Sequence, residues 1–492
     1  MDCLIAHIPK MLEWSPTFGW TSRIDFMSMG TLALAEELDR AGLSCRVVHV
    51  GVEKQLDPSF SLTQYVREHQ VRVLALALHW HPQTYDVLEA ARQLKAAEPG
   101  LFLVLGGLTA TCFAAEILAE HPAVDAVIRG EAERPLRQLV EGQPLGAVEN
   151  LSWRDGAEIR HNPVTFLTSG ADMDALTFGA WHLVEHAAQC LSQNWRHLWD
   201  PRLRGRLAPP VEPTLFGAAL GRGCLGTCTW CAGSYGAMRA TTGRRKTAWR
   251  AAERVAETFE AARSAGAKRI YTCFDPHPRR AEQILTLLEV LGQLSPRVPL
   301  DFECFGLPSE QVVRAFHHNL DPSSTLIVSP ECADEAVRKR HRAFPFSNAD
   351  LFATLTLMGQ LGMKTDLYYI IGLPGEDRSG IAATRDLQDD LQARFTSVRR
   401  QFTWPLEMEP GAPWHRDPEA HGLTLRHRGL ADFYAAHRQP NFSLGYDTAT
   451  LTEAEILSLY HDWFLRVPEG VARALAAYLR EFGAPPPLAR VF

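Results

Sequence analysis

Two stretches of the chain alternate short apolar runs with amphipathic helical segments, and a segment of weaker pattern separates them. Such alternation is typical of parallel sheets whose strands are joined by helices, and it argues against an all-helical or all-β fold. The first stretch, residues 1–150, predicts an α/β domain with an open, doubly wound, Rossmann-like sheet. The second stretch, residues 214–404, contains six strand–helix units, which favours a partial (β/α)6 barrel over a complete eight-unit barrel.

The segments outside these two stretches have a different character. Residues 151–213 accumulate Pro, Trp and Arg, and we interpret them as a linker that contains a hairpin near Leu151–Arg160. Residues 405–492 open with a proline-rich stretch and then predict a small, mostly helical C-terminal region, with helices over Glu453–Leu465 and Gly470–Phe482.

Charge and composition exclude several classes of protein. The 492 residues carry a formal net charge of −7, whereas a nucleic-acid-binding surface would need a net basic balance. No run of about twenty apolar residues occurs, which predicts no membrane span, and Met1–Lys10 lacks the parts of a signal peptide. Ten cysteines without a secretory signal favour free thiols or metal ligands, so a cytoplasmic protein is expected.

Three cysteines lie close together on the loop that follows the first expected barrel strand: Cys224, Cys228 and Cys231. A 4Fe–4S cluster normally takes four thiolates, so three local ones would leave one iron open to a small molecule. Glycines around the first cysteine allow the tight loop that a cluster requires. Two alternatives stay open, namely a zinc site, whose usual paired ligand spacings are missing downstream, and three unrelated buried cysteines.

The spacing Cys-x3-Cys-x2-Cys, with an aromatic residue before the last cysteine, resembles the radical S-adenosylmethionine (SAM) superfamily. This resemblance implies that the three cysteines hold a 4Fe–4S cluster whose open iron binds the methionine part of SAM. Residues 329–331 and 369–376 resemble the segments that bind SAM after the fourth and fifth strands of the family. A helix-capping carboxylate and a plain turn are the respective alternatives. The residues that the resemblance assigns to SAM are Trp230, Ser329, Glu331, Ile371, Gly372 and Leu373.

Residues 104–111 and 124–133 resemble the cobalamin-binding domain found ahead of many radical SAM barrels. A Gly-Gly pair at a strand end lets the backbone approach a bulky ligand, and neighbouring threonine hydroxyls can bond to the tail of that ligand. The residues assigned to cobalamin are Gly106, Gly107, Thr109, Thr111, Gly130 and Glu131.

The chain departs from the usual cobalamin-binding pattern in its first loop. Met27 stands where the family has a histidine that ligates cobalt, and residues 76–78 lack an expected serine. A bound cobalamin should therefore lack a histidine ligand from that loop. His79 and His81 lie near the appropriate strand end, where either a packing role or a cobalt-facing role remains open. A domain that binds no cobalamin also remains open.

The resemblance covers residues 1–150 and 215–415 and implies a cobalamin-dependent radical SAM C-methyltransferase. In such enzymes a reduced cluster cleaves SAM to a 5′-deoxyadenosyl radical, which abstracts hydrogen from an unactivated carbon, and methylcobalamin supplies a methyl group. The alternatives are a cyclisation or rearrangement without methyl transfer, and a non-catalytic iron–sulfur electron-transfer protein. The expected substrate is a small natural-product intermediate, with a peptide as the alternative. Flavodoxin or ferredoxin is the expected electron donor.

Several other residues are candidates with two readings each. The basic run 244–246 is expected on a solvated helix face, with a role near the SAM carboxylate as the alternative. Asp275 and His277 face either the active site or solvent. Cys45, Cys273 and Cys304 are expected to be small buried hydrophobic residues. The aromatic side chains expected either to close the substrate pocket or to pack in the core are Trp404, Trp414, His415, Tyr434 and Trp463.

Overall fold

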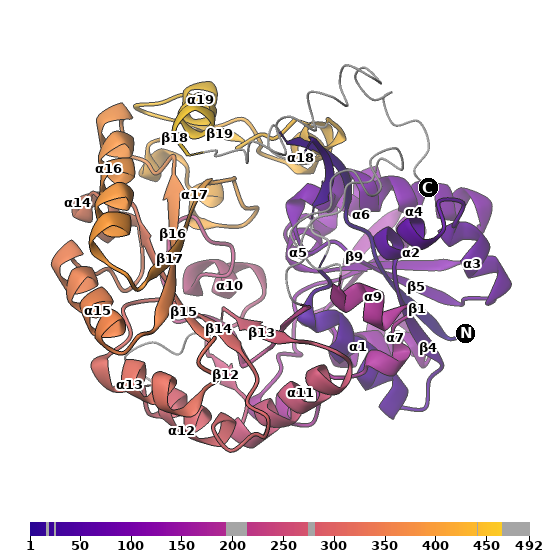
Figure 1. Cartoon of the computed structure of the whole chain (residues 1–492). Coiled ribbons are helices and arrows are strands. Elements are labelled where there is room, and N and C mark those ends of the chain that lie inside the picture. Colours follow the sequence, from indigo (N-terminus) through magenta and orange to yellow (C-terminus); the bar gives the residue numbers. More distant parts are fainter. Residues whose placement is uncertain (16–18, 24–25, 193–213, 274–280, 440, 465–492) are drawn as a thin grey trace.

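The computed structural model describes residues 1–15, 19–23, 26–192, 214–273, 281–439 and 441–464. Figure 1 shows an N-terminal α/β domain beside an open arc of strands that is lined on its outside by helices. The expected helix over residues 470–482, the end of the expected linker, and Asp275 and His277 lie outside the described residues.

A seven-stranded sheet forms the centre of the N-terminal domain, in the order β4-β1-β5-β6-β7-β8-β9. The first five strands in this order are parallel. From β1 the chain first adds β4 on one side and then β5, β6 and β7 on the other, so the direction of winding reverses between β1 and β5. Open α/β sheets bind ligands at the carboxyl ends of strands beside such a reversal. The strands are β1 (Cys3–His7), β4 (Cys45–His49), β5 (Val73–Ala77), β6 (Phe102–Gly106), β7 (Ala126–Ile128), β8 (Leu151–Asp155) and β9 (Glu158–His161).

The hairpin β8–β9 belongs to this sheet and not to a linker. β8 pairs antiparallel with β7, and β9 pairs antiparallel with β8. The N-terminal sheet therefore continues to His161, past the boundary at residue 150 expected from the sequence. The physical reason is that β8 covers the edge of β7, which would otherwise present unpaired backbone groups.

Helices cover both faces of the N-terminal sheet, which explains why its parallel strands are almost entirely apolar. A separate hairpin of β2 (Lys10–Ser15) and β3 (Gly19–Arg23) follows β1. The helices are α1 (Met29–Arg40), α2 (Val50–Leu56), α3 (Leu62–Glu68), α4 (Thr84–Ala97), α5 (Leu108–Cys112), α6 (Ala114–Glu120) and α7 (Glu133–Val140). Two short helices, α8 (Gly170–Asp174) and α9 (Ala187–Ser192), follow β9.

The second sheet has six parallel strands in the order β10-β13-β14-β15-β16-β17, which confirms the expected partial (β/α)6 barrel. The strands are β10 (Leu215–Gly217), β13 (Arg269–Thr272), β14 (Leu300–Cys304), β15 (Thr325–Glu331), β16 (Lys364–Ile371) and β17 (Val398–Pro405). A short pair, β11 (Gly221–Arg222) and β12 (Ala248–Trp249), follows β10.

Helices pack on the outer face of the barrel sheet. Ile270 and Phe302 share one core cluster with residues of the helices beside them, and Leu367 and Tyr369 share another. No helix in the described ranges has both the length and the apolar character needed to cross a membrane. The helices of this part are α10 (Tyr235–Thr241), α11 (Ala252–Ser264), α12 (Ala281–Leu291), α13 (Glu310–Asn319), α14 (Glu335–His341), α15 (Asn348–Gln360) and α16 (Arg378–Arg394).

The C-terminal region joins the far end of the barrel to the N-terminal domain, as Figure 1 shows at α18. Trp414, Phe433 and Tyr446 belong to the same buried cluster as the strand residues Leu4 and Leu76 of the N-terminal domain. The elements of this region are α17 (Pro413–Arg416), α18 (Leu430–Arg438), α19 (Glu453–Trp463), β18 (Leu423–Leu425) and β19 (Tyr446–Thr448).

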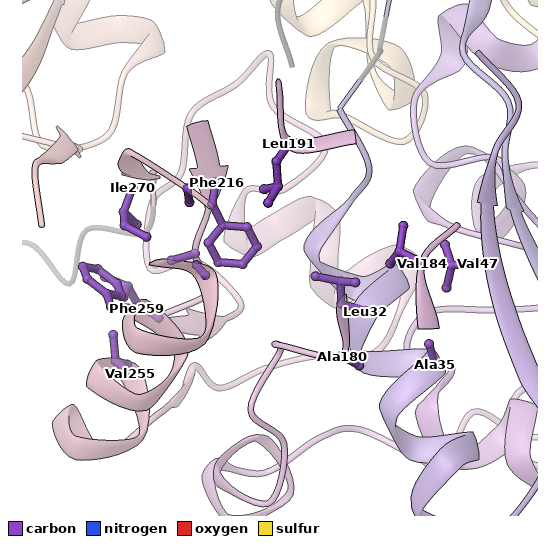
Figure 2. Close-up of a cluster of buried hydrophobic side chains, with 14 of the residues drawn as sticks. Leu32, Ala35, Val47, Ala180, Val184, Leu191, Phe216, Val255, Phe259 and Ile270 are labelled. Carbon is purple, nitrogen blue, oxygen red and sulfur yellow. The ribbon is translucent and has the colours of Figure 1, made fainter. Parts of the chain in front are cut away.

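A second continuous core joins the N-terminal domain to the first barrel strand. Figure 2 shows Leu32 and Ala35 of α1 and Val47 of β4 on one side, and Phe216 and Phe259 on the other. The two domains are thus fixed to one another at both ends of the barrel arc. Burial of apolar surface stabilises such an arrangement by roughly 25 cal/mol per Å².

Candidate functional site

The loop after β11 carries the three cysteines, and each of their sulfur atoms accepts a backbone N–H. The N–H of Gly226 donates to Cys224 Sγ at 3.1 Å, and that of Gly233 donates to Cys231 Sγ at 3.3 Å. The third donor comes from a distant segment, because the N–H of Ala343 donates to Cys228 Sγ at 3.3 Å. Hydrogen bonds to sulfur stabilise thiolates and tune the potentials of iron–sulfur clusters, so these residues fit a cluster.

The zinc alternative receives no support from the arrangement of side chains. The described residues contain no group of three His, Cys, Asp or Glu side chains that is close enough to hold one metal ion, and this includes the three cysteines. Zinc needs its ligands within about 2.3 Å of a single point. The cysteines that hold a 4Fe–4S cluster bind different iron atoms, so their sulfur atoms need not converge in this way.

His341 joins the cysteine loop to two other segments. Its Nδ1 lies 3.0 Å from Thr229 Oγ1, and its Nε2 lies 2.8 Å from the carbonyl oxygen of Pro374. The N–H of Thr229 donates to the His341 carbonyl, and the N–H of Trp414 donates to the Thr229 carbonyl. Burial lowers the pKa of His341 to about 4, so the imidazole is neutral at pH 7. Residues 338–341 also resemble a segment of the cobalamin-dependent subgroup, but nothing in the sequence indicates this connecting role.

Glu331 lies at the end of β15 in a backbone conformation that is rare for residues with side chains. Its φ is +64°, and the pairing of β15 with β16 is irregular at this point. Its carboxylate forms a buried ion pair with Arg342. The capping alternative is wrong, because Asp334 caps α14. Left-handed backbone outside glycine is concentrated at functional sites, so Glu331 stays a candidate, together with the buried Ser329.

The segment after β16 carries the residues 371–373 that the resemblance assigns to SAM. The side chains of Ile371 and Leu373 are fully buried in the core that contacts the N-terminal domain. The N–H groups of Gly372 and Leu373 donate to Glu376 Oε2 at 3.0 Å and 2.9 Å. The Gly372 carbonyl accepts the Tyr446 hydroxyl at 2.9 Å. Ile370 is only half-buried and packs against the edge of the same core.

Trp230 stands half-buried beside the cysteines, with its ring centroid 6.3 Å from that of Trp414 in an edge-on arrangement. Next to it, the N–H of Ala232 donates to Glu409 Oε2 at 2.6 Å. Burial raises the pKa of Glu409, and burial likewise raises the pKa of the Cys231 thiol. Trp230 therefore has an accessible surface at the place where the resemblance puts the adenine, and Glu409, in a segment (409–413) that also resembles the cobalamin-dependent subgroup, is its neighbour.

In the N-terminal domain, Gly107 makes the close backbone approach expected of a strand-end glycine. Its φ is +109°, and a Cβ there would lie 2.6 Å from the Leu78 carbonyl oxygen and from His79 Cα. The Thr109 hydroxyl donates to the His79 carbonyl at 3.0 Å, and that of Thr111 donates to the Gly107 carbonyl at 2.7 Å. The hydroxyls thus donate within the domain, and only their lone pairs remain for a ligand.

Gly107→Ala is expected to destabilise the N-terminal domain by about 1–3 kcal/mol through its backbone conformation alone, and the clash with residues 78 and 79 adds to this. Urea unfolding measures the change. Gly106→Ala is the matched control, because its Cβ would meet nothing closer than the Ile128 carbonyl oxygen at 4.0 Å. Equal stability of the two variants would contradict the close approach.

The carboxylate of Glu131 is held by residues outside the N-terminal sheet. Arg244 Nε donates to Glu131 Oε1 at 2.5 Å, and Arg244 Nη2 donates to Oε2 at 2.8 Å. Arg222, two residues before Cys224, forms a bidentate pair with Glu133. The N–H of Thr168 also donates to Glu131, at 2.6 Å. We call Glu131, Glu133, Thr168, Arg222 and Arg244 the interdomain ion-pair cluster.

This cluster corrects one expectation from the sequence. Arg244 is buried and is not part of a solvated face. The carboxylate of Glu131, which the resemblance assigns to cobalamin, takes part in the contact between the two domains. Gly130 lies within this contact, since a Cβ there would come within 3.3 Å of Thr242 Cβ.

The two candidate histidines have different surroundings. His81 is buried, with its Nδ1 2.9 Å from His437 Nε2 of α18, which favours the packing role. His79 lies at the carboxyl end of β5, beside the strand-order reversal. Burial, followed by Arg222 and His7, lowers the pKa of His79 to about 4, so this ring is neutral at pH 7. Met27 packs on the core next to α1.

The C-terminal aromatic residues divide between core and surface. Trp414 is fully buried, Tyr434 packs against Tyr85, and Trp463 lies near two arginines, whereas Trp404 is half exposed. Cys45 and Cys304 are buried as expected, but Cys273 is exposed. Sequence reasoning missed Glu303 and Tyr271, although two acidic residues at alternate positions of the strand Leu300–Cys304 were a usable signal for a polar inner face.

These features define a class: a B12-binding domain followed by a six-stranded parallel barrel with a three-cysteine loop. Residues 19–140 match the B12 binding domain family. The described fold is that of the cobalamin-dependent radical SAM enzymes, so the resemblance inferred from the sequence motifs is confirmed at the level of domain and fold.

Two solved structures show the same architecture. One is the radical SAM methyltransferase TsrM of Kitasatospora setae with cobalamin and a 4Fe–4S cluster bound. Its TM-score is 0.64 at 13% identity, over 93% of this chain and 90% of that one. The other is the cobalamin-dependent SAM radical enzyme OxsB, with a TM-score of 0.56 at 12% identity, over 97% of this chain and 61% of that one.

Two curated relatives match shorter parts of the chain. An uncharacterised methyltransferase of Pyrococcus horikoshii is 30% identical over 92 residues, 18% of this chain and 20% of the relative. The anaerobic magnesium-protoporphyrin IX monomethyl ester cyclase of Cereibacter sphaeroides is 27% identical over 178 residues, 35% of this chain and 26% of the relative. The matches thus span about a quarter or less of these relatives' lengths.

Proposed function

We propose that this chain is a cobalamin-dependent radical SAM enzyme that methylates an unactivated carbon of a small molecule. The observation that carries the proposal is the set of three N–H···S hydrogen bonds around Cys224, Cys228 and Cys231, on a loop next to Arg222, which pairs with Glu133 of the B12-binding domain. Such donors stabilise thiolates that bind a cluster and have no evident purpose around three ordinary buried cysteines.

The cofactors, when bound, supply reductive cleavage of SAM to a radical and a transferable methyl group. The chain's own residues hold and shield them. The three cysteines bind the cluster, Trp230 and Ile370 offer apolar surface to the adenine, and Ser329 offers a hydroxyl to SAM. Gly106 and Gly107 allow cobalamin to approach the carboxyl ends of the N-terminal strands. The continuous cores at both ends of the barrel fix the two cofactor sites relative to each other.

The choice of methyl transfer rests on relatives. TsrM, whose solved structure with tryptophan substrate is similar to this chain, is a radical SAM methyltransferase, and the Pyrococcus horikoshii relative is an uncharacterised methyltransferase. A second candidate function is cyclisation without methyl transfer. It is supported by the 178-residue match between this chain and the Cereibacter sphaeroides cyclase. We further propose a cytoplasmic location and a flavodoxin or ferredoxin as electron donor.

Anaerobic reconstitution with iron, sulfide and cobalamin tests the proposal. Wild-type protein is expected to bind about four irons and one equivalent of cobalt. The triple variant Cys224→Ala, Cys228→Ala, Cys231→Ala is expected to lose the iron and keep the cobalt. Cys45→Ala with Cys304→Ala serves as a control that removes buried cysteines away from the loop. Zinc in place of iron, or iron retained by the triple variant, would overturn the proposal. Deuterated methyl SAM then separates methyl transfer from cyclisation.

A further inference from the structure

The inner face of the barrel sheet, turned away from the helices, carries polar and aromatic side chains. Ile270, Phe302 and Leu367 point into the outer cores, and side chains alternate along strands, so Tyr271, Glu303 and Tyr368 lie on the inner face. The contacts agree with this, because the Tyr271 hydroxyl donates to Glu303 Oε2. The ring centroid of Tyr368 lies 5.5 Å from that of Phe402 in an edge-on arrangement.

Most acidic side chains of this inner face have a cationic partner. Arg269 pairs with Asp301 at 2.7 Å, Arg399 pairs with Asp366 at 2.7 Å, and Arg342 pairs with Glu331. Glu303 differs from them. Its carboxylate accepts the Tyr271 hydroxyl and forms no ion pair with any residue that the structure describes. Burial raises the pKa of Glu303, and Tyr271 and the more distant Arg342, which pairs with Glu331, act in the opposite direction. A half-buried carboxylate in such surroundings is complementary to a cation.

The surroundings of Glu303 also suit a cation with an apolar body. Tyr271, Tyr368 and Phe402 present ring faces and edges nearby, and rings attract ammonium groups by roughly 0.5–2 kcal/mol. Phe402 is 43% exposed and Trp404 is 50% exposed, although both lie on the last strand of the barrel sheet. Large exposed aromatic residues at such a place indicate a surface that a ligand covers.

This inner face is continuous with the cysteine loop. Cys273 lies two positions after Tyr271, on the same face of the chain, and its side chain is exposed. Burial, then Glu303, raises the pKa of its thiol, and Cys224 contributes in the same direction. The carboxylate of Glu303 thus lies on the same side of the sheet as the cysteine loop.

We propose that Glu303, with Tyr271, Tyr368 and Phe402, binds the cationic nitrogen of a small aromatic or apolar amine. Binding of the amine does not depend on the proposed function. Only the identification of this amine as the substrate rests on that function. Glu303 is a specificity-determining residue: it rejects anionic analogues by repulsion and neutral ones because they leave its charge unpaired.

Equilibrium dialysis of the reconstituted full-length protein tests the proposal with three matched probes: 2-phenylethylamine, 2-phenylethanol and 3-phenylpropionate. Wild-type protein is expected to bind the amine at least about tenfold more tightly than either other probe. Glu303→Gln keeps an acceptor for Tyr271 and is expected to reduce this preference to about one. Phe402→Leu is expected to weaken binding of the amine severalfold without removing its preference over the propionate.

Glu310→Gln, at an exposed position of α13, is the matched control and is expected to behave as wild type. An amine that binds no better than the alcohol, or a preference that survives in Glu303→Gln, overturns the proposal. Iron, cobalt and SAM cleavage are measured on the same preparations. Loss of cofactors with the preference retained would count against the proposed function alone, whereas full cofactor content without any preference would count against this inference alone.

Discussion

Arg244→Met is expected to lower the free energy of unfolding by about 3–5 kcal/mol, which is the usual cost of leaving one partner of a buried ion pair alone. The side chains of Arg244 and Glu131 are 5% and 8% exposed, and three hydrogen bonds from Arg244 to Glu131 and the Thr168 carbonyl would be lost together. Urea unfolding followed by circular dichroism measures the change. Arg245→Met is the matched control, because its side chain is exposed one position further along the same loop.

The double variant Arg244→Met, Glu131→Leu separates the ion pair from the uncompensated charge. It should recover most of the loss, because no charge then remains buried without a partner. A double variant as unstable as Arg244→Met would show that the contribution of Arg244 comes from its packing and its bonds to backbone carbonyls. Since this contact fixes residues 130–133 against Arg222, we expect Arg244→Met also to lower cobalamin affinity.

The ion pair has a defined pH dependence. Burial alone would raise the pKa of Glu131, but Arg244, Arg222 and Thr168 outweigh it and hold the pKa below 4.5, the ordinary value. A carboxyl whose pKa is depressed in the folded state contributes stability above its unfolded pKa and loses it as pH falls through the folded pKa. Wild type should therefore lose stability relative to the double variant as pH falls through the folded pKa of Glu131, because the double variant has no carboxyl to protonate at this position.

The order of the N-terminal elements could be predicted from the sequence because each parallel strand of that sheet is buried on both faces and forms an apolar run. The six strand–helix units expected over residues 214–404 likewise correspond to the six parallel strands of the barrel sheet. The hairpin β8–β9 was recognised as a hairpin but assigned to a linker. Its partner is an edge strand more than twenty residues earlier, and nothing in the local pattern identifies a non-local edge.

The candidate site was predictable only where its residues are neighbours in sequence. Three cysteines within one loop form a signal that is visible without a fold. By contrast, Glu131 and Arg244 are separated by 113 positions, and the sequence around either residue gives no indication that it contacts the other. The burial of the Ile371 and Leu373 side chains was not predictable for a related reason. A strand that is apolar on both faces does not show which face is turned inward.

Glu376 holds the turn after β16 by a carboxyl that is 2% exposed. Its Oε2 accepts the N–H groups of Gly372 and Leu373, while its Oε1 is buried without a hydrogen bond to any residue that the structure describes. Burial raises the pKa of this carboxyl to about 7, and Asp334 and Asp377 act in the same direction, against the two backbone N–H groups. The group is therefore half protonated near neutral pH.

Glu376→Gln is expected to make the free energy of unfolding less dependent on pH. The unfolded pKa is 4.5 and the folded pKa is about 7, so the folded state binds more protons between these values. The contribution of this carboxyl to the free energy of unfolding of the wild type is fully present below the unfolded pKa. It falls, by up to about 3 kcal/mol, as pH rises through the folded pKa. Glutamine keeps the acceptor for both N–H groups and has no proton to lose. Urea unfolding at about pH 5 and about pH 8 measures the difference, with the exposed Glu253→Gln as control.

Parallel pH profiles of wild type and Glu376→Gln would show that the carboxyl is ionised throughout and that the turn tolerates a buried charge. A flatter profile in the variant would show that the turn loosens as Glu376 ionises. In that case the SAM affinity of the wild type should fall at high pH, and the SAM affinity of Glu376→Gln should not. The reason is that Glu376 Oε2 holds the N–H groups of both Gly372 and Leu373. These two residues connect β16 to Pro374, whose carbonyl oxygen His341 links to the cysteine loop. The protonation of one buried carboxyl would then set the upper pH limit for SAM binding.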